Sequence, residues 1–123
     1  MKSLMFLVAC LCMPFFINAH HSTNANFTQE IISIEGVIER VRFQNPHASV
    51  LIKNTNHQGA ETFWLIESGA RTTLERLGIS LDVLKVGSKV TATGRKGRRQ
   101  YTMYLREIEL ADGTVFVPQP DLN

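Results

Sequence analysis

The chain of 123 residues is long enough for one domain, since domains typically contain about 100 to 150 residues. Its 13 lysine and arginine residues against 11 acidic residues give a formal net charge of +2. This near-neutral balance argues against nucleic acid or an acidic lipid surface as a partner. Both cysteines, Cys10 and Cys12, lie close to the N-terminus, so a domain formed by the remaining residues has no thiol and no disulfide.

The N-terminal segment has the pattern of an export signal. Lys2 supplies a positive charge, residues 4–17 are almost wholly apolar, and Ala19 is the small residue that a signal peptidase requires. We therefore expect residues 1–19 to be removed and the mature protein to be periplasmic or secreted. The apolar run is shorter than the roughly 20 residues that cross a bilayer as a helix, so we expect no transmembrane anchor. A second interpretation, a lipoprotein attached through Cys10, would leave only a short signal before the cysteine.

The first part of the mature chain is predicted to be a polar arm followed by one long strand. Residues 20–30 are mainly polar and are expected to form an extended arm. Apolar side chains then occupy even positions, such as Ile32 and Ile34, and move to odd positions after Gly36. Because one extra residue shifts the side-chain register by one, this change of phase predicts a strand with a bulge at Gly36.

The middle of the chain predicts two further strands. Asn45-Pro46 ends the first strand, and residues 48–52 alternate between apolar and polar before the polar turn at 54–59. Residues 62–67 are apolar at positions on both faces, which predicts a third strand in the centre of the sheet.

The remaining elements complete a barrel pattern. Residues 70–77 have apolar positions at helical spacing and precede Gly78, which predicts one short helix. After it we expect strands at 89–93, 101–110 and 114–117, with a basic loop at 94–100 and a turn at Asp112-Gly113. This order predicts a mainly β fold: a five-stranded Greek-key barrel of the OB type with one short helix between strands 3 and 4. The barrel is expected to span residues 31–118, followed by a short tail at 119–123.

An N-terminal copper site is the sharpest functional hypothesis. Removal of the signal would make His20 the first residue, so that its α-amine and imidazole could chelate one metal ion. His47 could complete the nitrogen-rich set that Cu(II) favours, and Glu67 could add an oxygen or orient a ligand. Cleavage one residue earlier would place His21 third, which is also a copper-binding arrangement. In the alternative interpretation these histidines form a polar terminus and an ordinary turn, and Glu67 belongs to a strand end.

A second hypothesis is an anionic or sugar-like ligand. OB domains often bind ligands at the loop between their last barrel strands and on aromatic strand positions. The residues at these places are Trp64, Arg95, Lys96, Arg98 and Arg99. The alternatives are that the basic run is a solvated loop and that Trp64 packs in the core. A protein–protein adaptor without a small ligand is a third possibility.

Enzymatic activity finds no support in the sequence. The mature chain has no thiol, no G-x-S-x-G elbow, no H-E-x-x-H motif and no phosphate-binding glycine loop. We therefore expect a binding module and not an enzyme, with a metal ion or small ligand as partner, copper as the one candidate cofactor and any protein partner left open.

Short motifs along nearly the whole mature chain form a specific combination. They are His20-His21-Ser22, Gly36, Asn45-Pro46-His47, Trp64-x-Ile66-Glu67, Leu77-Gly78, Leu84-x-x-Gly87-x-x-Val90-x-x-x-Gly94, Leu105-Arg106 and Asp112-Gly113. The combination resembles a widespread family of small exported bacterial proteins whose function is unassigned. The resemblance implies an exported OB-like barrel and no established activity. Phe43 and Thr28 depart from it, since a tryptophan and an acidic residue are expected there, and residues 94–100 are more basic than usual.

Overall fold

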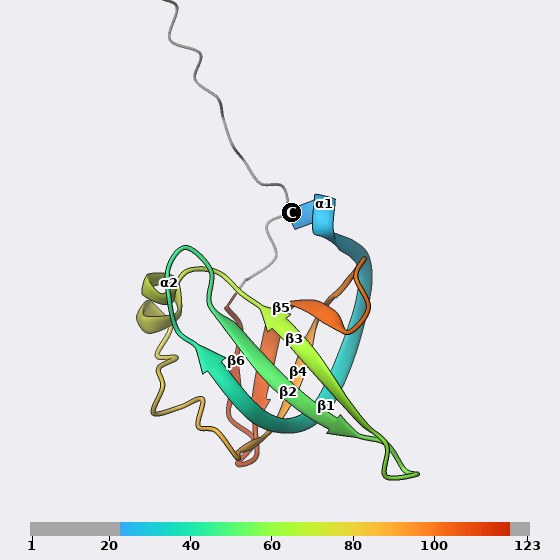
Figure 1. Cartoon of the computed structure of the whole chain (residues 1–123). Helices are drawn as coiled ribbons and strands as arrows, with labels where there is room; N and C mark the ends of the chain where they lie inside the picture. The colour runs from blue at the N-terminus through green and yellow to red at the C-terminus, as the bar shows by residue number, and fades with distance from the viewer. Residues whose placement is uncertain (1–22, 119–123) are drawn as a thin grey trace, which may run out of the picture.

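The computed structural model describes residues 23–118, which form a small β-barrel with two short helices (Figure 1). The elements in chain order are α1 (Thr23–Asn26), β1 (Phe27–Arg42), β2 (Ser49–Thr55), β3 (Glu61–Glu67), α2 (Arg71–Arg76), β4 (Lys89–Gly97), β5 (Thr102–Leu110) and β6 (Val115–Phe116).

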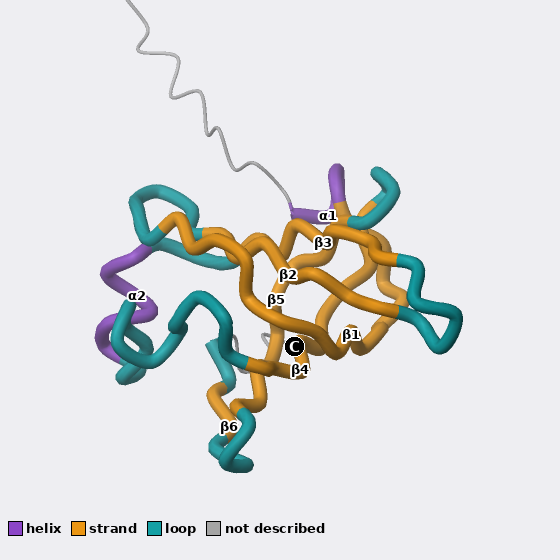
Figure 2. The backbone as a smooth tube through the Cα atoms, turned by 60° about the horizontal axis from the view of Figure 1, so that its bottom comes forward, coloured by secondary structure: helices purple, strands orange, loops and turns teal. Residues whose placement is uncertain are grey.

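The strands close into a barrel of the OB type. Their order is β3-β2-β1-β4-β5-β6, and an additional parallel pairing between β3 and β5 closes the sheet. The long strand β1 takes part in both halves, because its first part pairs with β4 and its second part pairs with β2 (Figure 2). The predicted five-stranded barrel with a helix between the third and fourth strands is confirmed, and β6 adds a two-residue strand beside β5.

The barrel interior is filled by aliphatic side chains. Strand residues such as Ile38, Ile52 and Ile108 are fully buried. Leu74 of α2 belongs to the same core cluster and is 2% exposed. The free space between α2 and the barrel is only about 10 Å³, too little for a ligand because even one water needs about 10–15 Å³. This part of the core is thus filled by side chains, whereas the larger hollows described below lie on the outer surface.

A bulge bends β1, but three residues later than the sequence pattern suggests. Ile38 pairs with Ile52 whereas Arg40 pairs with Leu51, so the extra residue is Glu39 and the prediction of a bulge at Gly36 is wrong in position. Gly36 has a different role: a Cβ there would collide with the Lys53 carbonyl oxygen of β2. Glycine is needed at this position because two backbones approach closely.

The ends of two strands also differ from the prediction. β1 begins at Phe27, which is 4% exposed, so the last four residues of the predicted arm are part of the barrel. β4 continues to Gly97, so the prediction of a loop from 94 to 100 is wrong, and the connection to β5 is short. The glycine at 94 suggests a loop, but it stands where a Cβ would meet the Tyr104 carbonyl oxygen of β5. It therefore marks close strand contact instead of a turn.

Candidate ligand site on the outer barrel face

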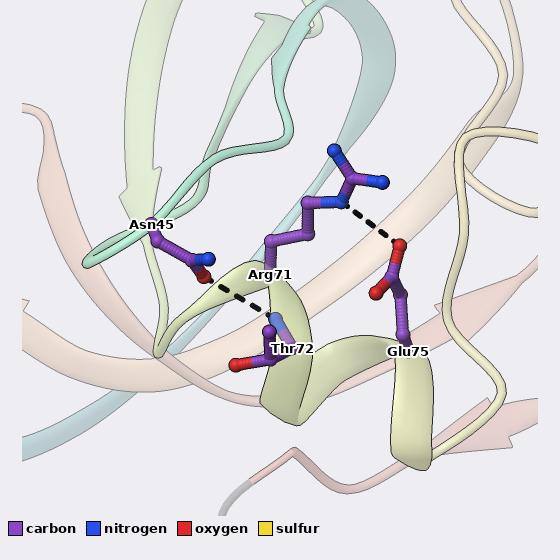
Figure 3. A network of polar contacts seen from close by, with 4 residues as sticks. All are labelled: Asn45, Arg71, Thr72 and Glu75. Carbon is purple, nitrogen blue, oxygen red and sulfur yellow. Dashed lines mark hydrogen bonds and ion pairs between the residues drawn. The ribbon is translucent and has the colours of Figure 1, made fainter.

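The Asn-Pro motif after β1 fastens the β1–β2 loop to the start of α2. The Asn45 side-chain oxygen accepts a hydrogen bond from the Thr72 backbone N–H at 3.3 Å (Figure 3). The Arg71 backbone N–H donates to the Gln44 carbonyl at 3.1 Å, and the Arg71 guanidinium pairs with Glu75 at 2.9 Å. The motif thus has a structural role, because its hydrogen bonds hold the β1–β2 loop against the start of α2.

The predicted copper ligands are only partly within the described residues. His20 and His21 lie outside them, His47 is exposed in the β1–β2 loop, and Glu67 is half-buried at the end of β3. Ser49, two residues after His47, is the register partner of Glu67, so the two segments run side by side. Among residues 23–118 no group of three or more His, Cys, Asp or Glu side chains could hold a metal ion.

Arg95 belongs to a structural clamp, because its guanidinium binds the N-terminal segment. Nε donates to the Thr28 carbonyl at 2.8 Å, and Nη1 donates to the Thr23 hydroxyl at 3.2 Å. Nη2 donates to the Asn24 side-chain oxygen at 2.6 Å and to the Phe27 carbonyl at 3.2 Å. These bonds hold α1 and the start of β1 against β4, so Arg95 has few donors left for a ligand.

Arg98 and Arg99, by contrast, line an open hollow of about 520 Å³, here called the loop hollow. Its other lining residues are Ala25, Asn26, Phe27, Glu67 and Thr102. Figures 1 and 2 show the β4–β5 loop beside α1, and the Arg98 N–H donates to the Asn26 carbonyl at 2.9 Å. Within residues 23–118 the side chains of Arg98 and Arg99 are exposed and have no hydrogen-bond or ion-pair partner. Glu67 and the two arginines, predicted for different ligands, thus share one hollow.

A second hollow of about 280 Å³ lies on the outer face of β1, β2 and β3, and is here called the strand hollow. It is lined by Arg40, Arg42, Ser49, Leu51 and Leu65. This arginine pair is absent from the candidates that the sequence predicts. The signal is nevertheless present in the change of phase along β1, because side chains that alternate with the inward-facing Val41 must face outward.

The two hollows are neighbours across β3. Leu65 lines the strand hollow and pairs with Thr102, which lines the loop hollow. Glu67 lines the loop hollow and pairs with Ser49, which lines the strand hollow. Side chains of adjacent strands on one face lie side by side, so the hollows form one continuous outer face.

The aromatic residues of β3 divide between the core and this face. Trp64 pairs with the fully buried Ile52 and packs against the core, with its ring edge-on to Tyr101 at 5.4 Å. Phe63, the residue before it, is 49% exposed and pairs with Lys53 on the outer face. Phe63, and not Trp64, is therefore the β3 ring available to a ligand on that face.

Lys53 on the same face is already paired. Its ammonium lies 3.2 Å from Glu39 and 3.6 Å from Glu61. The hydrogen bond and charge of Glu39, with a smaller contribution from Glu61, raise the pKa of Lys53 above its ordinary 10.5. Within the described residues, the positive charges of this face that lack side-chain partners are the two arginine pairs.

The closed barrel and its outer hollows define the protein as a module of the OB-fold class. More particularly, the chain belongs to the "Family of unknown function (DUF6152)", whose model matches residues 7–105. No helix within residues 23–118 has the length and apolarity to cross a membrane.

Two solved structures share the fold. The N-terminal domain of PriB from Thermoanaerobacter tencongensis, described as dimeric, aligns with a TM-score of 0.52 at 16% identity and covers 68% of this chain and 98% of that one. The mitochondrial single-stranded DNA binding protein Rim1 of S. cerevisiae aligns with a TM-score of 0.52 at 13% identity and covers 69% and 95%. These identities show the fold alone. No curated protein matches the chain.

Proposed function

We propose that the protein is an exported binding module that holds an anionic, hydroxyl-bearing ligand in the loop hollow. The observation that carries this proposal is the pair Arg98 and Arg99, whose guanidinium groups have no side-chain partner among the described residues. Each guanidinium has five N–H donors in a planar fork that matches a carboxylate or phosphate.

The other lining groups narrow the ligand further. Glu67 brings a carboxylate into the same hollow, and a carboxylate repels a bare anion but accepts hydrogen bonds from hydroxyl or amine groups. A ligand with both a negative group and hydroxyl donors satisfies the arginines and Glu67 together. Sugar acids and sugar phosphates have this combination.

Calorimetric titration of the signal-free protein with galacturonate and with glucose 6-phosphate, at low salt, tests the proposal. We expect the double variant Arg98→Ala/Arg99→Ala to lose about tenfold or more in affinity, because each charged hydrogen bond contributes about 1.5–3 kcal/mol. Arg76→Ala/Lys85→Ala removes two positive charges from exposed positions outside the hollow and should leave binding unchanged. Binding that is absent in the wild type, or equal in both double variants, would contradict the proposal.

Export is the second part of the proposal and is supported by the signal pattern of residues 1–19. The intact mass of protein recovered from the periplasm should lack Met1 to Ala19. A mass that retains this segment, or a lipid on Cys10, would contradict the expected processing.

Copper binding at the mature N-terminus is the second candidate function. Its support is the position of the arm: Thr23 is held by Arg95, and Ala25 lines the same hollow as Glu67. His20 precedes Thr23 by three residues in the sequence, so only a short segment separates it from α1.

Cu(II) titration distinguishes this candidate. Processed protein should bind more tightly than protein with one extra N-terminal residue or with His47→Ala, because the free α-amine exists only at the processed terminus. Affinity should rise with pH as the amine, with a pKa of about 8, loses its proton. Equal affinity in all three proteins would place the metal elsewhere.

A further inference from the structure

The bulge in β1 creates a second cationic edge on the outer face. Without the extra residue at Glu39, the side chain of Arg40 would point into the barrel, as that of Ile38 does. The bulge instead turns Arg40 and Arg42 outward, into the strand hollow, and lets Val41 pack against the core. Both arginines are exposed and have no side-chain partner among residues 23–118. The bulge thus gives the face an arginine pair at the side opposite the loop hollow.

The strand register sets the spacing along the sheet between Arg40 and Thr102, which lines the loop hollow with Arg98 and Arg99. Arg40 pairs with Leu51, Leu51 with Leu65, and Leu65 with Thr102, so three strand spacings separate Arg40 from the wall of the loop hollow. Strands lie about 4.8 Å apart, which gives about 14 Å across the face. One carboxylate or phosphate bonds its arginine at about 2.8 Å and reaches one pair only. A ligand that uses both pairs must be extended and must carry more than one negative group.

The surface between the arginine pairs is apolar with isolated acceptors. Leu51 and Leu65 are half-buried in the middle, and Phe63 is 49% exposed one position further along the same face. Ser49 and Glu67 form the neighbouring row and offer oxygen acceptors. Such a strip can pack against the C–H faces of sugar rings while the acceptors bind hydroxyl groups.

We propose that an extended acidic oligosaccharide lies across β1, β2 and β3, with its negative groups at Arg40 and Arg42 on one side and at Arg98 and Arg99 on the other. This inference rests on the proposed function and names the class of ligand for that site. OB folds use this combination of sheet face and β4–β5 loop for oligosaccharides as well as oligonucleotides.

The side chains on the face favour the saccharide over a single nucleic-acid strand. Nucleic-acid grooves on this fold use successive aromatic rings for base stacking, whereas the outward positions of β2 and β3 carry one ring, Phe63. The carboxylates of Glu39, Glu61 and Glu67 lie on or beside the face, where they would repel a dense phosphate backbone. An oligosaccharide has a lower charge density and supplies hydroxyl donors for Glu67.

Calorimetry with four probes tests the inference on the full signal-free chain. The probes are hexagalacturonate, galacturonate, the neutral maltohexaose, and a 15-residue thymidine oligonucleotide. We expect hexagalacturonate to bind at least tenfold more tightly than galacturonate and maltohexaose, and more tightly than the oligonucleotide. Arg40→Ala/Arg42→Ala and Arg98→Ala/Arg99→Ala should each weaken the hexamer about tenfold, whereas Arg76→Ala/Lys85→Ala should not.

The probes separate this inference from the proposed function. Galacturonate should respond to Arg98→Ala/Arg99→Ala and not to Arg40→Ala/Arg42→Ala. If the hexamer binds no more tightly than the monomer, or is insensitive to Arg40→Ala/Arg42→Ala, the extended site is wrong and the proposed function stands. If no acidic probe binds, both fall. Tighter binding of the oligonucleotide than of the hexamer would overturn the ligand class. Unchanged circular dichroism and Tm of each double variant show that its fold is intact.

Discussion

The basic run from Arg95 to Arg99 contains two halves that look alike in sequence and differ in what they bind. Arg95 and Lys96 belong to β4, where the first makes four hydrogen bonds to residues 23–28 and the second pairs with Glu30 at 3.3 Å. Arg98 and Arg99 follow the strand, and their guanidinium groups line the loop hollow without side-chain partners among the described residues.

Position relative to the strands, and not charge, thus separates the arginine that is held by hydrogen bonds from the two whose side chains are exposed. Within β4, side chains stand beside β1, and the polar groups at its start take up the donors of Arg95. Within residues 23–118, Phe27 and Gly97 are the last register pair of β1 and β4, and the side chains of Arg98 and Arg99 beyond it are exposed. Four predictions test how far the two halves are separate in stability and binding.

The largest loss of stability is expected for Gly94→Ala, which disturbs β4 next to Arg95. A Cβ at this position would collide with the Tyr104 carbonyl oxygen, and backbone atoms cannot move aside as a side-chain end can. The free energy of unfolding, measured by urea denaturation, should fall by about 3 kcal/mol or more. Gly69→Ala is the matched control, because a Cβ added there would have no atom of the described residues within 4 Å and its φ is not positive. Equal losses in both variants would show that close β4–β5 contact is not the cause.

Arg95→Ala should have the next largest effect. It removes the four hydrogen bonds that the Arg95 side chain donates to residues 23–28. We expect a loss of about 2 kcal/mol, since bonds to a charged group contribute about 1.5–3 kcal/mol each and partial exposure reduces this value. Amide hydrogen exchange at residues 24–28 should accelerate in parallel. Arg98→Ala should change stability by less than about 0.5 kcal/mol, and a loss as large as that of Arg95→Ala would contradict the division of the run.

Binding of a ligand by Arg98 and Arg99 should appear as an increase in Tm. A ligand at ten times its Kd stabilises the folded state by RT ln 11, or about 1.4 kcal/mol. Galacturonate should therefore raise the Tm of the wild type and of Arg76→Ala/Lys85→Ala by similar amounts, and should raise the Tm of Arg98→Ala/Arg99→Ala by less than a third as much, because a tenfold weaker Kd leaves only RT ln 2, or about 0.4 kcal/mol. A Tm that rises equally in all three proteins would locate the anion elsewhere.

Local patterns in the sequence are sufficient to predict the barrel. Alternation at Val50 and Ile52 indicates β2, and Gly78, with φ of +81°, ends α2 where the helical spacing stops. The position of the bulge and the length of β4 are not predictable in this way. Gly36 and Gly94 suggest a bulge and a loop, but both are glycines because the backbone of a neighbouring strand, remote in sequence, lies against them.

The candidate site depends on contacts between distant segments, which the sequence does not reveal. Sequence patterns assign Glu67 to a metal and Arg98 to an anion separately, since nothing local indicates that the end of β3 and the β4–β5 loop share a hollow. That proximity follows from the parallel pairing of β3 with β5. The change of phase along β1 indicates that Arg40 faces outward, but it does not indicate that Arg40 and Arg42 share a hollow with residues of β2 and β3.

Lys53 is a paired charge on the outer face of β1, β2 and β3, where Arg40 and Arg42 have no side-chain partner among the described residues. Replacing Lys53 should change stability least of the four predictions. It stands on the same face as Arg40, but Glu39 and Glu61 hold it at 3.2 and 3.6 Å. The hydrogen bond to Glu39 raises its pKa in the folded protein above the ordinary 10.5. The pair therefore contributes its full stabilisation below pH 10.5, and this contribution is lost as the pH rises through the higher pKa of the folded state.

The Tm of the wild type should consequently fall more steeply above pH 10.5 than the Tm of Lys53→Met, while below that pH the two curves should run parallel. The difference should be small, since exposed ion pairs are screened by water and salt. Lys85→Met removes an exposed lysine that has no ion pair within residues 23–118, and its curve should follow the wild type. If Lys53→Met also follows the wild type above pH 10.5, the two carboxylates do not hold Lys53 in solution, and its ammonium then counts with the arginines as a charge available to the ligand.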